Sequence, residues 1–276
     1  MVTTTRIPAQ SPPPERPSRL RPVLRGLGEV CITLGLVVLL FVFYELRVTS
    51  WFSAREQARA TEQLRQRWQH DPADAEEPVD PVAGEGFARL HVPALGPDFP
   101  FTVLEGTDQS TLSAGPGHYA ESALPGQRGN FAVAGHRAGR MAPFAELDEL
   151  ESCDALVVET DSQWYVYRVL PLRGEVDGWD PEQRGRRCSG VAPIGGPYQG
   201  VLGRTVVEPT RREVINPVPG QPRGTVPEQW RSRLITLTTC HPRYSAEKRM
   251  IVHGVLTKRY PKVADRPELK PPELGR

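Results

Sequence analysis

The longest uninterrupted apolar run of the chain lies near its N-terminus. Residues 30–44 are apolar apart from Thr33, and Glu29 and Glu45 stand at the two ends of this run. A helix that crosses a bilayer needs about 20 apolar residues, with about 17 as a lower limit. The run therefore predicts a transmembrane helix over residues 26–48, whose ends rely on flanking side chains that reach the interfaces.

Beyond the first third of the chain, the pattern changes to short β-type runs between Gly, Pro and Asp residues. The runs occupy residues 88–92, 101–104, 131–136, 155–160, 164–170, 205–207, 234–239 and 250–256. Many short strands separated by turn residues are typical of a barrel or a sandwich. The pattern predicts an all-β domain over residues 87–260, with short helices at 107–113 and 143–150.

The segments around this domain are polar or rich in proline. Residues 53–69 contain strong helix formers with few apolar positions, which predicts an exposed helix. An acidic, proline-containing stretch follows it, so residues 49–86 are expected to form a juxtamembrane helix and a linker. The N-terminal residues 1–25 and the proline-rich tail 261–276 are expected to be disordered or loose.

The charges of the chain are balanced overall but uneven around the apolar run. The 276 residues include 34 Lys and Arg against 33 Asp and Glu, and this balance does not suggest a nucleic-acid partner. The length suits one globular domain with appendages. Five arginines precede the apolar run, so the positive-inside rule predicts a cytoplasmic N-terminus and an extracytoplasmic domain.

An uncleaved anchor fits the residues around the apolar run better than three alternatives. No small-residue cleavage site follows closely, which argues against a signal peptide. Lipid attachment at Cys31 would require small residues where Glu29 and Val30 stand. A buried core helix would not require flanks of such different charge.

The cysteine count is odd outside the predicted membrane helix, where Cys153, Cys188 and Cys240 remain. In an oxidising compartment, a bridge between Cys153 and Cys188 would leave Cys240 as the free thiol. Three unpaired thiols fit the spacing equally well, because spacing alone does not establish proximity. No C-x-x-C string occurs, so neither a zinc site nor a thioredoxin-type site is indicated.

Three residues at the ends of predicted strands form a candidate catalytic group. Cys240 ends the run T-L-T-T-C, His136 ends F-A-V-A-G-H, and Arg249 opens R-M-I-V-H-G-V-L. A cysteine thiolate is a strong nucleophile, an imidazole can exchange protons with it, and an arginine offers fixed donors to an oxyanion. The group indicates cysteine-dependent acyl transfer.

Each of these roles has a competitor nearby. His241 adjoins the cysteine, although consecutive residues on a strand point apart. Arg243 and Lys248 compete for the oxyanion role. Thr239 and Tyr119 are further candidates for contact with a substrate, although both also fit simple packing roles, and a cysteine at a strand end can be a small buried hydrophobe.

These strings together resemble the sortase transpeptidases. The segments G-P-G-H-Y, A-L-P-G-Q-R-G-N-F-A-V-A-G-H-R, A-P-F-A-E-L-D-E-L and T-L-T-T-C-H-P-R-Y-S-A are most similar to the actinobacterial class E sortases. The resemblance covers about residues 86–260 and the anchor, and it implies an eight-stranded β-barrel. One departure is a Gly- and Arg-rich stretch, residues 174–203, which is longer than the family pattern.

By this resemblance, Cys240 is the nucleophile, His136 the general acid and base, and Arg249 the group that stabilises the oxyanion and orients the substrate. The implied partners are secreted proteins with a C-terminal L-A-x-T-G or L-P-x-T-G sorting signal, and an amine of lipid II. No metal or organic cofactor is implied.

Three alternatives fit the residues of this chain less well. A pilus-polymerising sortase would carry a D-P-F or D-P-W lid, where this chain has D-P-A and D-P-V. An L,D-transpeptidase would carry S-H-G-C, which the T-T-C-H string of this chain does not match. A membrane-tethered β-barrel without activity would use the cysteine only for packing.

Overall fold

The computed structural model describes residues 20–44, 49–70, 80–96, 99–139, 142–263 and 269–275. The chain divides into two units, residues 1–48 and residues 49–276. Residues 1–19 of the predicted disordered N-terminus and most of the predicted linker lie outside the described residues, whereas residues 20–25, also predicted to be disordered, are helical.

The first unit contains the helix α1 (Leu20–Phe43). Its segment Pro22–Phe43 has a mean hydropathy of 2.4, and its described side chains are exposed all around the helix. Exposed apolar side chains on every side suit a lipid environment and not a protein core. Among the described residues, α1 is the one helix long and apolar enough to cross a membrane.

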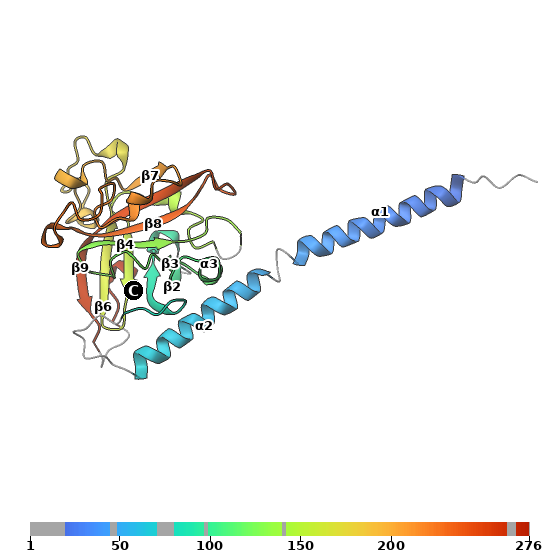
Figure 1. The fold of residues 1–276 in the computed structure, drawn as a ribbon, viewed down its shortest axis with the longest axis horizontal. Coiled ribbons are helices and arrows are strands. Elements are labelled where there is room, and N and C mark those ends of the chain that lie inside the picture. Colours follow the sequence, from blue (N-terminus) through green and yellow to red (C-terminus); the bar gives the residue numbers. More distant parts are fainter. Residues whose placement is uncertain are drawn as a thin grey trace, which may run out of the picture. The chain divides into compact units, whose positions relative to one another are not determined.

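The second unit is built around a β-barrel (Figure 1). The strands are β1 (Gly86–His91), β2 (Pro100–Glu105), β3 (Gly117–His118), β4 (Gly129–Ala134), β5 (Ala155–Glu159), β6 (Gln163–Val169), β7 (Arg204–Val207), β8 (Arg233–His241) and β9 (Lys248–Pro261). The order β6-β5-β1-β2-β3-β4-β8-β9 is closed into a ring of eight by pairing between β6 and β9, and β7 pairs with β9 outside this ring. The predicted eight-stranded barrel is confirmed.

The strand pattern differs from the expectation in two places. The pair Gly117–His118 forms β3, which bridges β2 and β4 and is too short to show any periodicity in the sequence. Strand β9 is longer than the predicted run 250–256, because it pairs with β6, β7 and β8 along different parts of its length.

The barrel interior is filled by alternate residues of its strands. Phe131 and Val133 from β4, and Ile235 and Leu237 from β8, belong to the main buried cluster together with Leu90. Each such side chain contributes roughly 1.5–3 kcal/mol when it leaves water. The intervening residues of each strand therefore point to the outer surface of the barrel.

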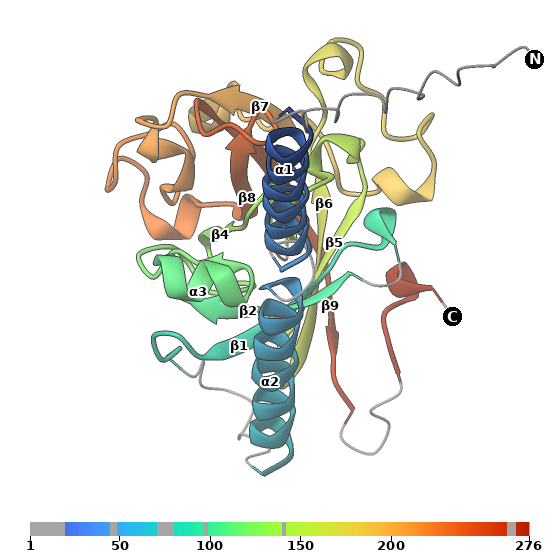
Figure 2. The same cartoon turned by 90° about the vertical axis from the view of Figure 1, so that its right-hand side faces the viewer.

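The helix α2 (Thr49–His70) packs against the barrel and is not exposed on all sides as the sequence predicted. Gln57, Ala60 and Leu64 are buried along one face, and Figure 2 shows α2 running beside β1 and β2. The side-chain amide of Gln57 donates to the carbonyl of Ala114 at 2.9 Å and accepts from the Thr102 N–H at 2.5 Å. The few apolar residues on this face are sufficient to dock α2, because Gln57 adds specific hydrogen bonds to the barrel domain.

The remaining predicted elements have mixed outcomes. The helix α3 (Gln109–Ala114) begins after Asp108, whose carboxylate accepts from two N–H groups of the first turn. The predicted helix at 143–150 is a turn followed by a short 3-10 helix, Leu147–Glu149. The tail is not uniformly loose, because Leu274 packs beside Trp164 and Glu273 forms an ion pair with Arg168 at 3.4 Å.

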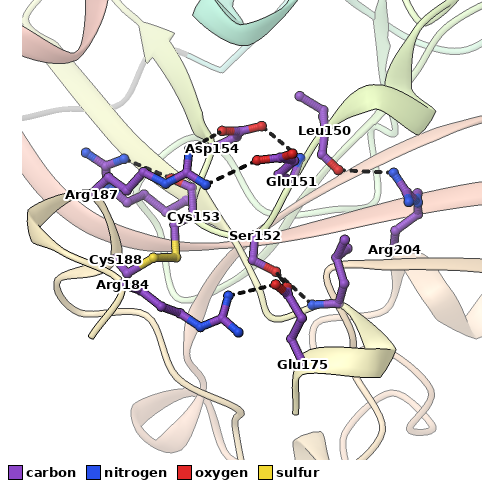
Figure 3. Close-up of polar contacts among 12 residues, drawn as sticks. Leu150, Glu151, Ser152, Cys153, Asp154, Glu175, Arg184, Arg187, Cys188 and Arg204 are labelled. Atoms are coloured by element: carbon purple, nitrogen blue, oxygen red, sulfur yellow. Dashed lines mark hydrogen bonds and ion pairs between the residues drawn. A yellow bond between two sulfur atoms is a disulfide. The ribbon is translucent and has the colours of Figure 1, made fainter. Parts of the chain in front are cut away.

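The long stretch 174–203 is joined to the barrel by a disulfide between Cys153 and Cys188 (Figure 3). Of the two alternatives that the cysteine spacing left open, the structure has the bridge and not three unpaired thiols. Arg187, next to Cys188, forms ion pairs with Glu151 at 3.2 Å and Asp154 at 3.6 Å. This segment is therefore fixed where it meets the start of β5.

The stretch 174–203 also contacts Ser152, the residue before Cys153. The Ser152 hydroxyl donates to the carboxylate of Glu175, which also pairs with Arg184 at 2.7 Å. These bonds, first that from Ser152, lower the pKa of Glu175 below its usual range. The stretch contains short 3-10 turns and no strand among its residues 174–203.

Candidate active site

The pairing of β8 with β9 places Cys240 directly opposite Arg249. Ile235 and Leu237 point into the barrel, so the alternation along β8 turns Thr238 and Cys240 to the outer face. Directly opposite residues of an antiparallel pair share one face of the sheet. The cysteine and the arginine therefore project on the same side.

His136 lies at the same end of the neighbouring strand β4. This strand runs parallel to β8 with Ala134 opposite Thr238, and the Gly135 N–H donates to the Thr238 carbonyl at 3.0 Å. The hydrogen bonds between β4 and β8 thus continue as far as Gly135, the residue before His136. The three sequence-predicted residues lie at one end of three adjacent strands, β4, β8 and β9.

The backbone at His136 is held on both sides. The His136 carbonyl accepts from the Phe144 N–H at 3.1 Å. A Cβ at Gly135 would lie 2.6 Å from the ring of Phe144, so only glycine permits this close approach. The Thr239 hydroxyl donates to the Gly135 carbonyl at 2.8 Å. The histidine therefore occupies a defined position next to the end of β8.

An open cavity of about 560 Å³ lies along the outer face of β8 and β9. Arg249 and Thr238 line it from these strands, and Tyr119 lines it from the segment after β3. The hydroxyl groups of Tyr119 and Thr238 are hydrogen-bonded at 3.0 Å. An open cavity of this size can take an extended peptide segment alongside Arg249.

The two predicted substrate contacts have different positions. Tyr119 lines the cavity. Thr239 is buried, and its hydroxyl is bonded to the main chain of β4. Thr238 occupies the cavity wall instead, and counting back two residues from Cys240 along the strand would have pointed to it.

The competitors for the arginine role make contacts with other side chains. Lys248 is paired with His241 in the ladder, on the face opposite to Arg249, and it forms an ion pair with Glu208 at 3.7 Å. Arg243 stacks over the ring of Tyr244. Within the described part of the chain, Arg249 donates to two main-chain carbonyls, at 3.1 Å each, and these neutral partners do not compensate its positive charge.

His241, the competing base, is engaged by a buried arginine. The guanidinium of Arg137 donates to Nδ1 of His241 at 2.6 Å and forms an ion pair with Asp148 at 2.9 Å. Since arginine can only donate, Nδ1 of His241 is an acceptor. This contact links the residue after His136 to the residue after Cys240, and apart from these adjacent positions no sequence pattern indicates it.

One wall of the cavity rests on a buried polar network. Asn130 donates to the Val214 carbonyl at 3.3 Å, and its own carbonyl accepts from the Thr236 hydroxyl at 2.6 Å. Nδ1 of His253 then donates to the Thr236 hydroxyl across 2.8 Å. Burial lowers the pKa of His253 to about 4, so the ring is neutral at pH 7. Because Val214 lines the cavity, the network holds that wall against the barrel.

The family model described as "Sortase domain" matches residues 90–257. The chain belongs to the sortase family of cysteine transpeptidases.

Three relatives illustrate the match. Sortase SrtE1 of Streptomyces coelicolor is 33% identical over 252 residues, which span 88% of this chain and 60% of that relative. The SrtF sortase from Corynebacterium diphtheriae is 40% identical, with a TM-score of 0.63 over 74% of this chain and 98% of that one. Sortase E1 from Streptomyces coelicolor, solved with a tripeptide in the active site, is 31% identical, with a TM-score of 0.50 over 70% and 99%.

Proposed function

We propose that this sortase is a membrane-anchored transpeptidase that cleaves a C-terminal sorting signal of secreted proteins and transfers them to an amine of a peptidoglycan precursor. The observation that carries the proposal is the register that sets Cys240 opposite Arg249, beside the strand that leads to His136 and next to the open cavity that Arg249 lines.

In the first step, the thiolate of Cys240 attacks the carbonyl carbon of the Thr–Gly bond in the signal. The carbon–nitrogen bond breaks, and the imidazolium of His136 gives its proton to the leaving amine. A thioester remains on the cysteine. The guanidinium of Arg249 stabilises the negative oxygen of the tetrahedral intermediate, because it carries a permanent charge and several fixed donors.

In the second step, an acceptor amine attacks the thioester carbon and its proton passes to His136. The carbon–sulfur bond breaks and the thiolate is restored, so the cycle needs no redox partner. Lipid II is the proposed source of the amine, and water gives hydrolysis as a side reaction.

The signal is proposed to be L-A-x-T-G or the related L-P-x-T-G. Class E relatives, among them one solved with a bound tripeptide, support a short peptide substrate. Tyr119 and Thr238, joined by their hydroxyl groups on the cavity wall, are the proposed contacts to its upstream part.

The anchor is proposed to be α1, with the N-terminus in the cytoplasm and the barrel outside. The apolar segment Pro22–Phe43 and the arginines before it support this orientation. The disulfide between Cys153 and Cys188 supports an oxidising compartment for the barrel.

The test uses the full chain in detergent with fluorogenic peptides that contain either signal and an added primary amine. Cleavage and amine transfer are expected for the native chain and are expected to be lost in Cys240→Ala, His136→Ala and Arg249→Ala. The matched control is Arg243→Ala, which removes an exposed arginine of the same hairpin and is expected to stay active.

A tethered barrel without activity is the competing hypothesis. It predicts that a folded chain cleaves neither peptide and that Cys240 does not react selectively with a thiol-directed reagent. The accessible position of Cys240, a free and only partly buried cysteine, favours the enzymatic proposal.

A further inference from the structure

A second open cavity of about 560 Å³ lies at the opposite end of β8 and β9 from Cys240. Arg233, which opens β8, lines it. At roughly 3.3 Å per residue, seven residues of strand separate Arg233 from Cys240 by about 23 Å. The second cavity is therefore distinct from the proposed peptide site, and its ligand does not take part in the bond rearrangement described above.

The lining of this cavity is strongly cationic. Its charged members, all positive, are Arg128, Arg231, Arg233, Lys258 and Arg259. Of these, Lys258 forms an ion pair, with Glu273 at 3.0 Å. No ion pair links the four arginines to a carboxylate within the part of the chain that the structure describes. The chain is nearly neutral overall, so this concentration of one sign is local.

Three of these guanidinium groups are held in place by carbonyl oxygens. Arg128 donates to the Arg231 carbonyl at 3.1 Å, Arg231 to the Val226 carbonyl at 2.9 Å, and Arg233 to the Gly126 carbonyl at 2.8 Å. An arginine has five N–H donors, so one such bond orients the group and leaves most donors for a ligand. Neutral carbonyls leave the charge in place, whereas a carboxylate would compensate it.

The carbonyl that holds Arg233 is itself fixed. The Gly126 N–H donates to the buried hydroxyl of Tyr167 at 2.7 Å, and a Cβ at Gly126 would lie 2.0 Å from the ring of Tyr165. The φ of Gly126 is +78°, a conformation that favours glycine. The base of the cavity is thus preorganised by the barrel.

The cationic groups act on one another. Desolvation, and then the charges of Arg259 and Arg128, lower the pKa of Arg233. An anion between these groups would replace repulsion by attraction. At the rim, Trp230 is 73% exposed and offers a large planar surface to whatever carries that anion.

We propose that this cavity binds an anion with several closely spaced phosphate groups, such as an oligophosphate or a phosphate-containing polymer. Guanidinium groups bind phosphate through paired parallel hydrogen bonds. A ligand that compensates four arginines in one cavity must carry several negative charges in a small volume. Adjacent phosphates supply that density, while the carboxylates of an acidic peptide are spread along the chain.

The experiment measures tripolyphosphate binding to the full chain in a neutral detergent, by calorimetry and by tryptophan fluorescence. Binding is expected in the native chain, and Trp230→Phe is expected to remove the fluorescence change. The double variant Arg128→Gln/Arg259→Gln is expected to bind about tenfold more weakly. The matched control is Arg173→Gln, an exposed arginine outside this cavity, with unchanged affinity.

Three results would overturn the proposal. The folded native chain could show no measurable binding, or the native chain and the double variant could bind tripolyphosphate with equal affinity. The native chain could also bind polyglutamate of the same total charge as tightly as tripolyphosphate. Thermal unfolding of each variant shows whether the fold is retained. Peptide cleavage is not part of the readout, so the outcome is independent of the proposed catalytic function.

Discussion

Arg137 donates a hydrogen bond to Nδ1 of His241 across 2.6 Å. Arg137 follows His136 and His241 follows Cys240, so the bond ties together the two segments that carry the proposed catalytic pair. The guanidinium is buried and also pairs with Asp148. A contact of this kind can fix the separation of two groups without touching the substrate.

We therefore expect Arg137→Met to reduce kcat for peptide cleavage by about tenfold with little change in KM, because misplacement of reacting groups mainly affects the chemical step. His241→Asn is expected to stay near native activity, since the asparagine carbonyl can accept the same bond. Steady-state kinetics on both variants make the comparison. A rise in KM as large as the fall in kcat, or full activity of Arg137→Met, would contradict a positioning role.

The hydrogen bond between Tyr119 and Thr238 gives a second prediction. Tyr119→Phe and Thr238→Val each remove one partner of the same bond and should lower kcat/KM by an amount equivalent to about 0.5–1.5 kcal/mol. The double variant should lose little more than either single variant, because both changes delete one interaction. Tyr244→Phe, at an exposed tyrosine, is the control. Strictly additive losses would show that the two hydroxyl groups act separately.

The disulfide predicts a large stability effect. Cys153 and Cys188 are separated by 35 positions in the sequence, and closing a loop of that length stabilises a domain by about 2–5 kcal/mol. Cys153→Ala/Cys188→Ala should lose about this much free energy of unfolding in a urea titration. A reductant should destabilise the native chain similarly and leave the double variant unaffected. A loss that is absent in both experiments would mean that the bridge does not form in the protein.

The buried His253 predicts a pH dependence of stability. Its pKa in the folded protein is about 4, below the ordinary value of 6.5, so the unfolded chain binds more protons between these two values. Stability is therefore lost as the pH falls through this window, by at most about 1.4 kcal/mol per pH unit for one histidine. His253→Asn, which retains a donor toward Thr236, should show a shallower loss between pH 6.5 and pH 4. If urea titrations show the same loss of unfolding free energy between pH 6.5 and pH 4 in both proteins, His253 is not the source of the pH dependence.

The sequence determined the elements whose signals are local. The apolar run marked α1, and the short β-type runs marked eight of the nine strands, because side-chain periodicity follows directly from backbone geometry. The pattern left barrel and sandwich open, and the eight-stranded barrel came from the family resemblance. The strand-end positions of Cys240, His136 and Arg249 could also be read from the chain, since each closes or opens a β-type run. Their catalytic roles remain a prediction.

Only the tertiary structure decided the features that join distant segments. Strand β3 has two residues and no periodicity of its own, and α2 is docked by a glutamine that looked like an exposed polar residue. The bridge between Cys153 and Cys188 needed proximity that spacing cannot supply. The cationic cavity likewise gathers arginines from three separate segments. In each case the physical reason is the same, because strand register and close packing depend on the partner surface, which the sequence of one segment does not contain.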